Sequence, residues 1–474
     1  MIIASFLFFL LLFVAVGVSS SLKSRNTKQD YYMASHSIPP WLVGLSAVAT
    51  NNSGYMFIGV IGYTYATGLA SIWLMLGWIA GDYLVSLFVH DKLRRAAVEG
   101  KQASYPGVLN YWAGFSSRTL QKIAALISLV FLLAYASAQL MAGSKALHVL
   151  FDWPEWGGAV IGALLVVAYC FAGGIRASIW TDAAQSLVMV LAMGLLLVTA
   201  TLALGGPAVA FEKMAAVDGF LDWFPRDLVI PGVAGGILFA LSWMFAGLSV
   251  IGQPHIMVRF MSLEGEGTMR RARAWYYVWF LMFYAMATAV GMLSRIYLPD
   301  ANSFDQELAL PMMALDVFPP LLVGLVLAGI FAATLSTADS LVLSCSSALT
   351  HDLFPERCKS TRSLKAATLV VTLAALAWAL TSSDSVFNLV IMAWALLASA
   401  FAPLVLVLAF GGRPSHALAL AMMAVGVLVA VGWRQLGLSG AIYEAMPGIL
   451  SGLAVYGLAR LVMPRALSSS ADSV

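Results

Sequence analysis

The chain is poor in charge. Of its 474 residues only 10% are Asp, Glu, Lys or Arg, whereas 61% are hydrophobic, and the mean hydropathy is +0.88. A soluble domain carries about 25% charged residues. The composition therefore excludes an ordinary soluble fold and predicts an all-α polytopic membrane protein. The net charge is only +3, and because no basic block is present we expect no nucleic-acid partner.

Cysteine is also scarce. The three cysteines, Cys170, Cys345 and Cys358, lie far apart, which argues against a disulfide framework or a cysteine metal site. No Ser/His/Asp or metal-ligand cluster is visible at one depth, so we do not expect an enzyme. A basic segment is missing before the apolar residues 1–20, which are therefore expected to be a retained first span, not a cleaved signal.

Apolar stretches long enough to cross a bilayer recur along the whole chain. We count about thirteen, each of about 20 residues. They lie near residues 2–21, 39–62, 68–89, 120–146, 156–174, 178–204, 230–252, 274–297, 319–349, 366–382, 386–410, 416–433 and 444–463. Since the count is odd, the two termini are expected on opposite sides of the membrane.

Charged residues alternate between loops. The basic loops hold Lys23, Arg25, Lys28, Lys92, Arg94, Arg95, Lys101, Arg118, Arg176, Arg259, Arg270, Arg271, Arg273, Arg357, Lys359, Arg362, Lys365 and Arg413. The loops between them hold Asp152, Glu155, Asp222, Asp227, Asp300, Asp305, Glu307 and Asp384. Because cytoplasmic loops carry the excess of Lys and Arg, we place the N-terminus outside and the C-terminus in the cytoplasm. The membrane is expected to be a bacterial-type inner membrane.

Two apolar segments are interrupted at corresponding places. Small and amide residues fill 49–55 in the first, and Gly252, Gln253 and Pro254 break the second. Paired interruptions of this kind point to a secondary-transporter binding site near the bilayer midplane, whereas a single one would indicate an ordinary kink. The sequence thus predicts two inverted five-helix repeats, at 39–206 and 229–410. An extra helix and loop at 1–38 precede them, and two helices and a tail at 411–474 follow.

Oxygen ligands for a cation are available near the first interruption. Backbone carbonyls freed around residues 49–52 could combine with the adjacent hydroxyls of Ser336 and Thr337. A neutral oxygen cage suits a weakly held monovalent cation, since a calcium site would recruit several carboxylates. Either hydroxyl alone could instead bond to its own preceding turn.

Intramembrane carboxylates are few. Asp82, Asp182 and Asp339 fall inside or beside predicted spans, where a lipid-facing charge is costly. Asp182 is expected on the ion route. Asp82 and Asp339 could equally hold helices together.

Three stretches resemble the sodium/solute symporters. Gly173–Gln185 looks like the signature of that family, and Ile251–Met261 and Ser346–Leu353 are similar to the bacterial sodium/proline symporter branch. The likeness extends from Asp30 to about Pro447. It implies a leucine-transporter-type fold that couples Na⁺ entry to solute uptake by alternating access. It also implies that the solute and the lipid bilayer are the only partners and that a monomer is sufficient for transport.

The resemblance also implies site residues. Sodium would be held by the carbonyls of Ala49, Asn52 and Ala333 and the hydroxyls of Ser336 and Thr337, with Asp182 on the ion path. The solute would be bound by Ser53, Gly54, Tyr55, Gly59, Tyr135, Gln139, Ala246, Val250 and Pro254.

Several positions depart from the proline symporters. That branch carries an aspartate where Asn51 stands, a tryptophan where Tyr55 stands, and aromatic residues where Ala246 and Val250 stand. The smaller residues would open the pocket, so we expect an amino acid such as proline or a larger one. A proton-coupled symporter and a transporter-like sensor that acts through a partner are the alternatives. Stoichiometry and oligomeric state do not follow from the sequence.

Overall fold

Helices make up most of the chain. The computed structural model describes residues 1–21, 27–228, 230–301, 303–382 and 385–462. Within these ranges the strand-type pairing is limited to one isolated bridge between Ile38 and Leu263. The prediction of an all-α fold is confirmed. Lys23, Arg25, Asp384 and the tail after residue 462 lie outside the described residues.

Nineteen α-helices and several short 3₁₀ or π turns follow one another along the described residues. The helices are α1 (Ile2–Ser21), α2 (Lys28–Met33), α3 (Pro40–Asn51), α4 (Ser53–Phe57), α5 (Gly59–Thr67), α6 (Ile72–Glu99), α7 (Tyr105–Trp112), α8 (Thr119–Phe151), α9 (Glu155–Ala203), α10 (Pro207–Ala215), α11 (Gly232–Leu248), α12 (Pro254–Met261), α13 (Met269–Tyr297), α14 (Ala309–Val317), α15 (Pro320–Ser347), α16 (Thr361–Thr381), α17 (Val386–Ala409), α18 (His416–Gln435) and α19 (Ala445–Val462).

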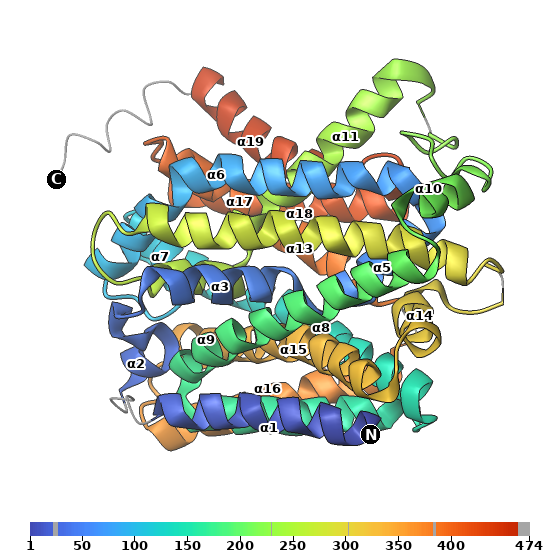
Figure 1. The fold of residues 1–474 in the computed structure, drawn as a ribbon. Helices are drawn as coiled ribbons and strands as arrows, with labels where there is room; N and C mark the ends of the chain where they lie inside the picture. The colour runs from blue at the N-terminus through green and yellow to red at the C-terminus, as the bar shows by residue number, and fades with distance from the viewer. Residues whose placement is uncertain (22–26, 229, 302, 383–384, 463–474) are drawn as a thin grey trace.

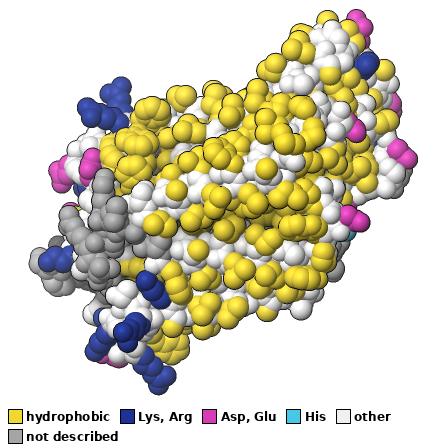
Figure 2. All heavy atoms as spheres, turned by 60° about the horizontal axis from the view of Figure 1, so that its bottom comes forward, with side chains coloured by type: hydrophobic (Ala, Val, Ile, Leu, Met, Phe, Trp, Pro, Cys, Tyr) yellow, Lys and Arg dark blue, Asp and Glu magenta, His cyan; other side chains and the backbone are white. Residues whose placement is uncertain are grey.

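The long helices run roughly parallel to one another as a bundle (Figure 1). Helices α2 and α7 lie at one end of the bundle, and α10 and α14 lie at the other. Figure 2 shows a face whose middle is covered by hydrophobic side chains, while charged side chains gather towards the two ends. This distribution is that of a protein whose flank contacts lipid and whose ends contact water.

Eleven segments of the described residues are long and apolar enough to cross a membrane, and Trp156–Phe171 is a shorter apolar helix. One of the eleven, Ser53–Glu99, joins the end of one predicted span to the next. The first interrupted span is itself divided into α3, α4 and α5. The chain is thus a multi-pass membrane protein.

Both predicted interruptions are breaks in helices. The first is at Asn52, between α3 and α4, where φ is −85° and ψ is 2°. The second is at Gln253, which follows a 3₁₀ turn, η3 (Ser249–Gly252), and is extended, with φ −100° and ψ 98°. Pro254 then occupies the first turn of α12, where its missing N–H is not needed.

Three basic residues assigned to loops, Arg94 in α6, Arg176 and Arg259, are in fact buried within helices, so that part of the loop prediction is wrong. Arg176 lies in α9, just after a break at Gly173 and Gly174, and its Nη2 is 2.8 Å from Oδ1 of Asp30. Arg259 lies in α12, because the chain resumes a helix after Pro254 instead of leaving the core. Counting charges by sequence position cannot distinguish a loop from such a helix.

Candidate functional site

The break at Asn52 exposes backbone carbonyls to α15. Ser336 Oγ donates to Ala49 O at 3.4 Å and to Ala333 O at 3.0 Å. Thr337 Oγ1 donates to Thr50 O at 2.9 Å. Four of the predicted cation ligands, together with the carbonyl of Thr50, therefore surround one interface between the broken helix and α15.

Asn52 is the fifth predicted cation ligand and is buried in the same break. Its backbone N and its Nδ2 both donate to Val48 O, each at 2.9 Å. These two hydrogen bonds to one carbonyl cap the C-terminal end of α3. The predicted cation ligands are neutral oxygens from the backbone and from hydroxyls, which can turn their hydrogens away from a cation, so their chemistry is compatible with Na⁺.

A buried ion cluster lies beside these ligands. Arg259 Nη2 is 3.1 Å from Oδ2 of Asp182 and 4.0 Å from Oδ1 of Asp339, and all three side chains are fully or almost fully buried. Ser46 Oγ donates to Asp182 Oδ2 at 2.6 Å and accepts from Arg259 Nε at 3.0 Å. Two carboxylates thus share one guanidinium, which leaves the cluster one negative charge in excess when both are ionised.

Thr50 links the cluster to the predicted cation ligands. Its hydroxyl lies 3.5 Å from Asp182 Oδ2 and 3.5 Å from Ser336 O. Asp182, predicted on the ion route, is therefore one side chain away from those ligands. The sequence did not predict that Arg259 would be the partner of Asp182. The signal was the proline at position 254, which starts a helix and places Arg259 a little over one turn inside it.

Four predicted solute residues meet where α4 faces α8. Tyr135 OH donates to Ser53 Oγ at 3.2 Å. Gly54 N donates to Gln139 Oε1 at 2.9 Å. A Cβ on Gly54 would lie 2.4 Å from Thr334 Cγ2, so only glycine fits this approach. The break, α8 and α15 thus converge on one point.

Aromatic rings close the site on the side of α5. The ring of Tyr55 stacks on Phe387 at 5.4 Å, and Phe387 also stacks on Tyr63 at 5.1 Å. Gly59, another predicted solute residue, leaves room for this stack, since a Cβ there would lie 3.0 Å from Tyr55 Cδ2. Phe387 thus covers one face of the ring of Tyr55, which is itself a predicted solute residue.

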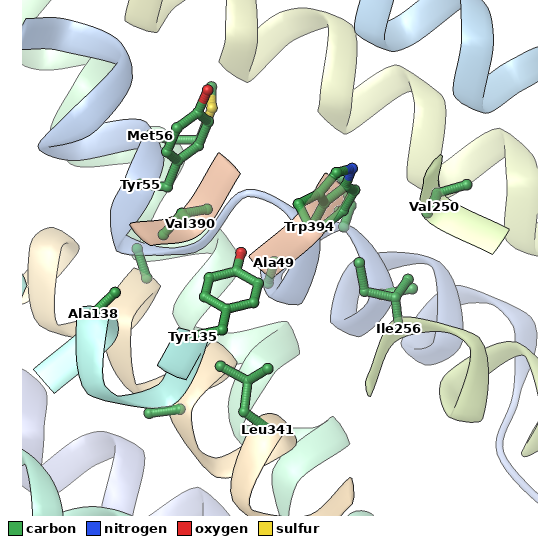
Figure 3. Packing of buried hydrophobic residues seen from close by; sticks show 14 of the residues in the cluster. Ala49, Tyr55, Met56, Tyr135, Ala138, Val250, Ile256, Leu341, Val390 and Trp394 are labelled. Atoms are coloured by element: carbon green, nitrogen blue, oxygen red, sulfur yellow. The ribbon is translucent and has the colours of Figure 1, made fainter. Parts of the chain in front are cut away.

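Ala246 lies near the end of α11 and Val250 in the 3₁₀ turn η3 that follows, and Trp394 approaches Ala246. Trp394 Nε1 donates to Ala246 O at 2.8 Å, and its ring lies 5.1 Å from that of Trp78. Figure 3 shows Tyr55, Tyr135, Trp394 and Val250 around Ala49. Two tryptophans therefore stand beside the small residues that the sequence analysis expected to enlarge the pocket.

Pro254 is separate from the other predicted solute residues. It lines a small cavity with Tyr105, Arg259 and Ser340, next to the ion cluster and towards α7. The structure therefore groups Pro254 with the ion cluster and not with Tyr55 or Gln139.

Comparisons with known proteins identify the family of this chain. A family model described as the sodium:solute symporter family matches residues 31–426. The chain belongs to the sodium:solute symporter family. This symporter is a membrane transporter and not an enzyme, and Na⁺ is its coupling ion. The sodium/proline symporters of Staphylococcus aureus strains JH9 and NCTC 8325 are each 30% identical to it, over 96% of this chain and 91% of theirs.

Solved structures share the fold of the symporter. One is a Na⁺-coupled sialic acid symporter in a substrate-bound outward-open state, with a TM-score of 0.80, 19% identity, and 98% of this chain and 97% of that chain covered. Another is a nucleobase-cation-symport-1 family transporter in a closed conformation, with a TM-score of 0.59, 16% identity, and 92% and 95% covered.

Proposed function

We propose that this symporter carries an amino acid such as proline, or a larger one, into the cell by alternating access, driven by Na⁺. The observation that carries the proposal is the meeting of Ala49, Thr50, Ala333, Ser336 and Thr337 at the break of the first interrupted helix. We infer that Na⁺ binds there, with the Asn52 carbonyl completing the ligand set. Asp182 would receive the ion on its way towards the cavity lined by Pro254 and Arg259.

The solute would bind between α4, α8 and the aromatic stack. Gln139 Nε2 and Tyr55 OH are buried and have no hydrogen-bond partner among the residues that the structure describes, so both are available to a polar ligand. A side-chain amide N–H suits a carboxylate oxygen of an amino acid. The rings of Tyr135 and Trp394 would enclose its apolar part, and Ala246 and Val250 would set its length. The proline symporters among the relatives support this solute class.

The architecture proposed for this function is thirteen spans with two inverted repeats, at residues 39–206 and 229–410. Breaks at Asn52 and Gln253 in the first helix of each repeat support it. Positive residues such as Arg271 and Lys359 and acidic ones such as Asp218 and Asp305 favour an N-terminus outside and a cytoplasmic C-terminus.

Uptake of labelled proline into proteoliposomes tests the proposal. The expected result is accumulation under an inward Na⁺ gradient and no accumulation when choline replaces Na⁺, with other amino acids as competitors. Ser336→Ala/Thr337→Ala should abolish the Na⁺ dependence, because it removes both hydroxyl ligands. Ser19→Ala/Ser117→Ala, which removes two exposed hydroxyls, is the matched control. Unchanged Na⁺ dependence in the Ser336/Thr337 variant would contradict the proposed ion site.

A further inference from the structure

One buried carboxylate remains without a role in this scheme. Asp82 lies in the middle of α6 and is fully buried. Tyr277 OH donates to its Oδ1 at 2.7 Å, and Tyr276 OH donates to its Oδ2 at 2.7 Å. Asn51 Nδ2 donates to the same Oδ2 at 3.2 Å. Both carboxylate oxygens are therefore held by neutral donors.

No positive group compensates this charge. Within the described part of the chain, none of the ion pairs includes Asp82. Asp182 and Asp339 share Arg259, which leaves their cluster one negative charge in excess, whereas Asp82 has no basic partner among the described residues. A carboxylate that only joined helices could be replaced by an amide at no electrostatic cost, whereas an uncompensated charge inside a membrane costs several kcal/mol. An ionised Asp82 would therefore be stabilised by a cation that the protein does not itself carry.

Asn51 connects Asp82 to the place where such a cation would bind. Residue 51 is the last of α3 and lies between Thr50 and Asn52, whose backbone forms the break. Its Nδ2 also donates to the hydroxyl of Tyr276. Helix α13, which provides both tyrosines, packs against α3 and α6 (Figure 1). The amide of Asn51 thus joins the carboxylate to the residue next to Thr50, whose carbonyl accepts from Thr337 of α15.

We propose that Asp82 is the fixed negative charge that balances the coupling Na⁺ at the break of the first interrupted helix, acting through Asn51 and not as a ligand. The inference rests on the proposed ion site. The neutral carbonyls and hydroxyls would coordinate the ion through their oxygens but carry no net charge. Asp82 would supply the long-range electrostatic attraction for the cation. In this role Asp82 is a positioning residue for the cation.

Equilibrium binding of radiolabelled Na⁺ to the purified full-length protein tests the proposal without knowledge of the solute. We expect Asp82→Asn to raise the half-saturating Na⁺ concentration at least tenfold, which corresponds to about 1.4 kcal/mol. Asp91→Asn on the same helix is the control. Its carboxylate is partly exposed and pairs with Arg273, so we expect no more than a twofold change.

An exchange of the two side chains separates charge from structure. In Asn51→Asp/Asp82→Asn the carboxylate and the amide change places across the same 3.2 Å contact, and binding should return to within threefold of the original. This double variant also covers the case in which Asp82→Asn fails to fold. A folded Asp82→Asn that binds Na⁺ as well as the original would overturn the role of Asp82, as would a folded exchange variant that stays tenfold weaker. Absence of Na⁺ binding by the original protein would instead refute the proposed ion site itself.

Discussion

At the scale of single residues, Arg259 is the most sensitive side chain of the interior. Arg259→Gln would leave Asp182 and Asp339 without their shared partner, and breaking a buried ion pair costs about 3–5 kcal/mol. We expect a clear fall in the thermal unfolding temperature, measured by tryptophan fluorescence in detergent. Arg270→Gln, at an exposed position, serves as the control. Partial recovery on adding Asp339→Asn would identify charge as the cause.

Gly54 makes a different residue-scale prediction. In Gly54→Ala the new Cβ would lie 2.4 Å from Thr334 Cγ2 and 3.1 Å from Gln139 Oε1. Overpacking of this kind costs about 1–3 kcal/mol, and here it would also separate α4 from α8. Transport should fall below a tenth of the original rate, whereas Gly157→Ala, with no atom within 4 Å of its Cβ, should transport normally. Normal transport by Gly54→Ala would show that the approach of α4 is not required.

Sequence reasoning reached residues only where their neighbours in the chain carry the signal. The run of small and amide residues around Asn52 predicts a helix break, and the adjacent hydroxyls of Ser336 and Thr337 predict oxygen ligands for a cation. Thr50 as a ligand carbonyl and Trp394 beside Ala246 depend on contacts between helices far apart in sequence. No local pattern specifies such contacts.

At the scale of elements, the aromatic stack connects α5 to the start of α17. The backbone N of Phe387 donates to Glu307 Oε1 at 2.8 Å, and Lys145 Nζ lies 2.5 Å from Oε2 of the same residue. The carboxylate thereby fixes the first turn of α17 and, with it, the ring that covers Tyr55 and Tyr63. Movement of α17 would uncover the solute residues from this end.

Phe387→Ala should therefore open the site towards the α10 and α14 end. In a background without native cysteines, we expect Ser53→Cys to react several times faster with a membrane-impermeant maleimide when Phe387 is replaced. Phe410→Ala removes a ring at the far end of α17, against Phe88, and should leave the rate unchanged. Equal rates in both backgrounds would mean that the stack does not control access.

Helix boundaries show the same division between local and distant causes. The ends of α1 at Ser21 and of α17 at Ala409 fall within a residue of the positions expected from hydropathy. The prediction missed the continuation beyond Pro254, because an apolar count stops at the first break. The break at Gly174, in contrast, agrees with the predicted end of a span at residue 174. Its φ is +57°, and a Cβ there would lie 2.4 Å from Tyr31 O, a contact with α2 that no sequence pattern records.

At the scale of the whole molecule, the orientation in the membrane can be tested directly. Asp218, at 90% side-chain exposure, lies in the loop after α10, and Arg271, also exposed, lies in the first turn of α13; we assign the two positions to opposite sides. A cysteine at position 218 should react with an impermeant reagent in intact cells, and one at position 271 only after permeabilisation. The reverse pattern would invert the assignment, and labelling of both from outside would contradict the span count.

The uncompensated carboxylate of Asp82 has an electrical consequence. A carrier that holds Na⁺ beside the fixed charge of Asp82 is less negative by one charge in its loaded form than in its empty form. Moving one charge through the full membrane potential is worth about 2.3 kcal/mol per 100 mV. A negative cell interior therefore acts chiefly on the return step of the empty carrier. It repels the negative charge towards the outside and so favours the state in which the site can take up the next Na⁺ ion.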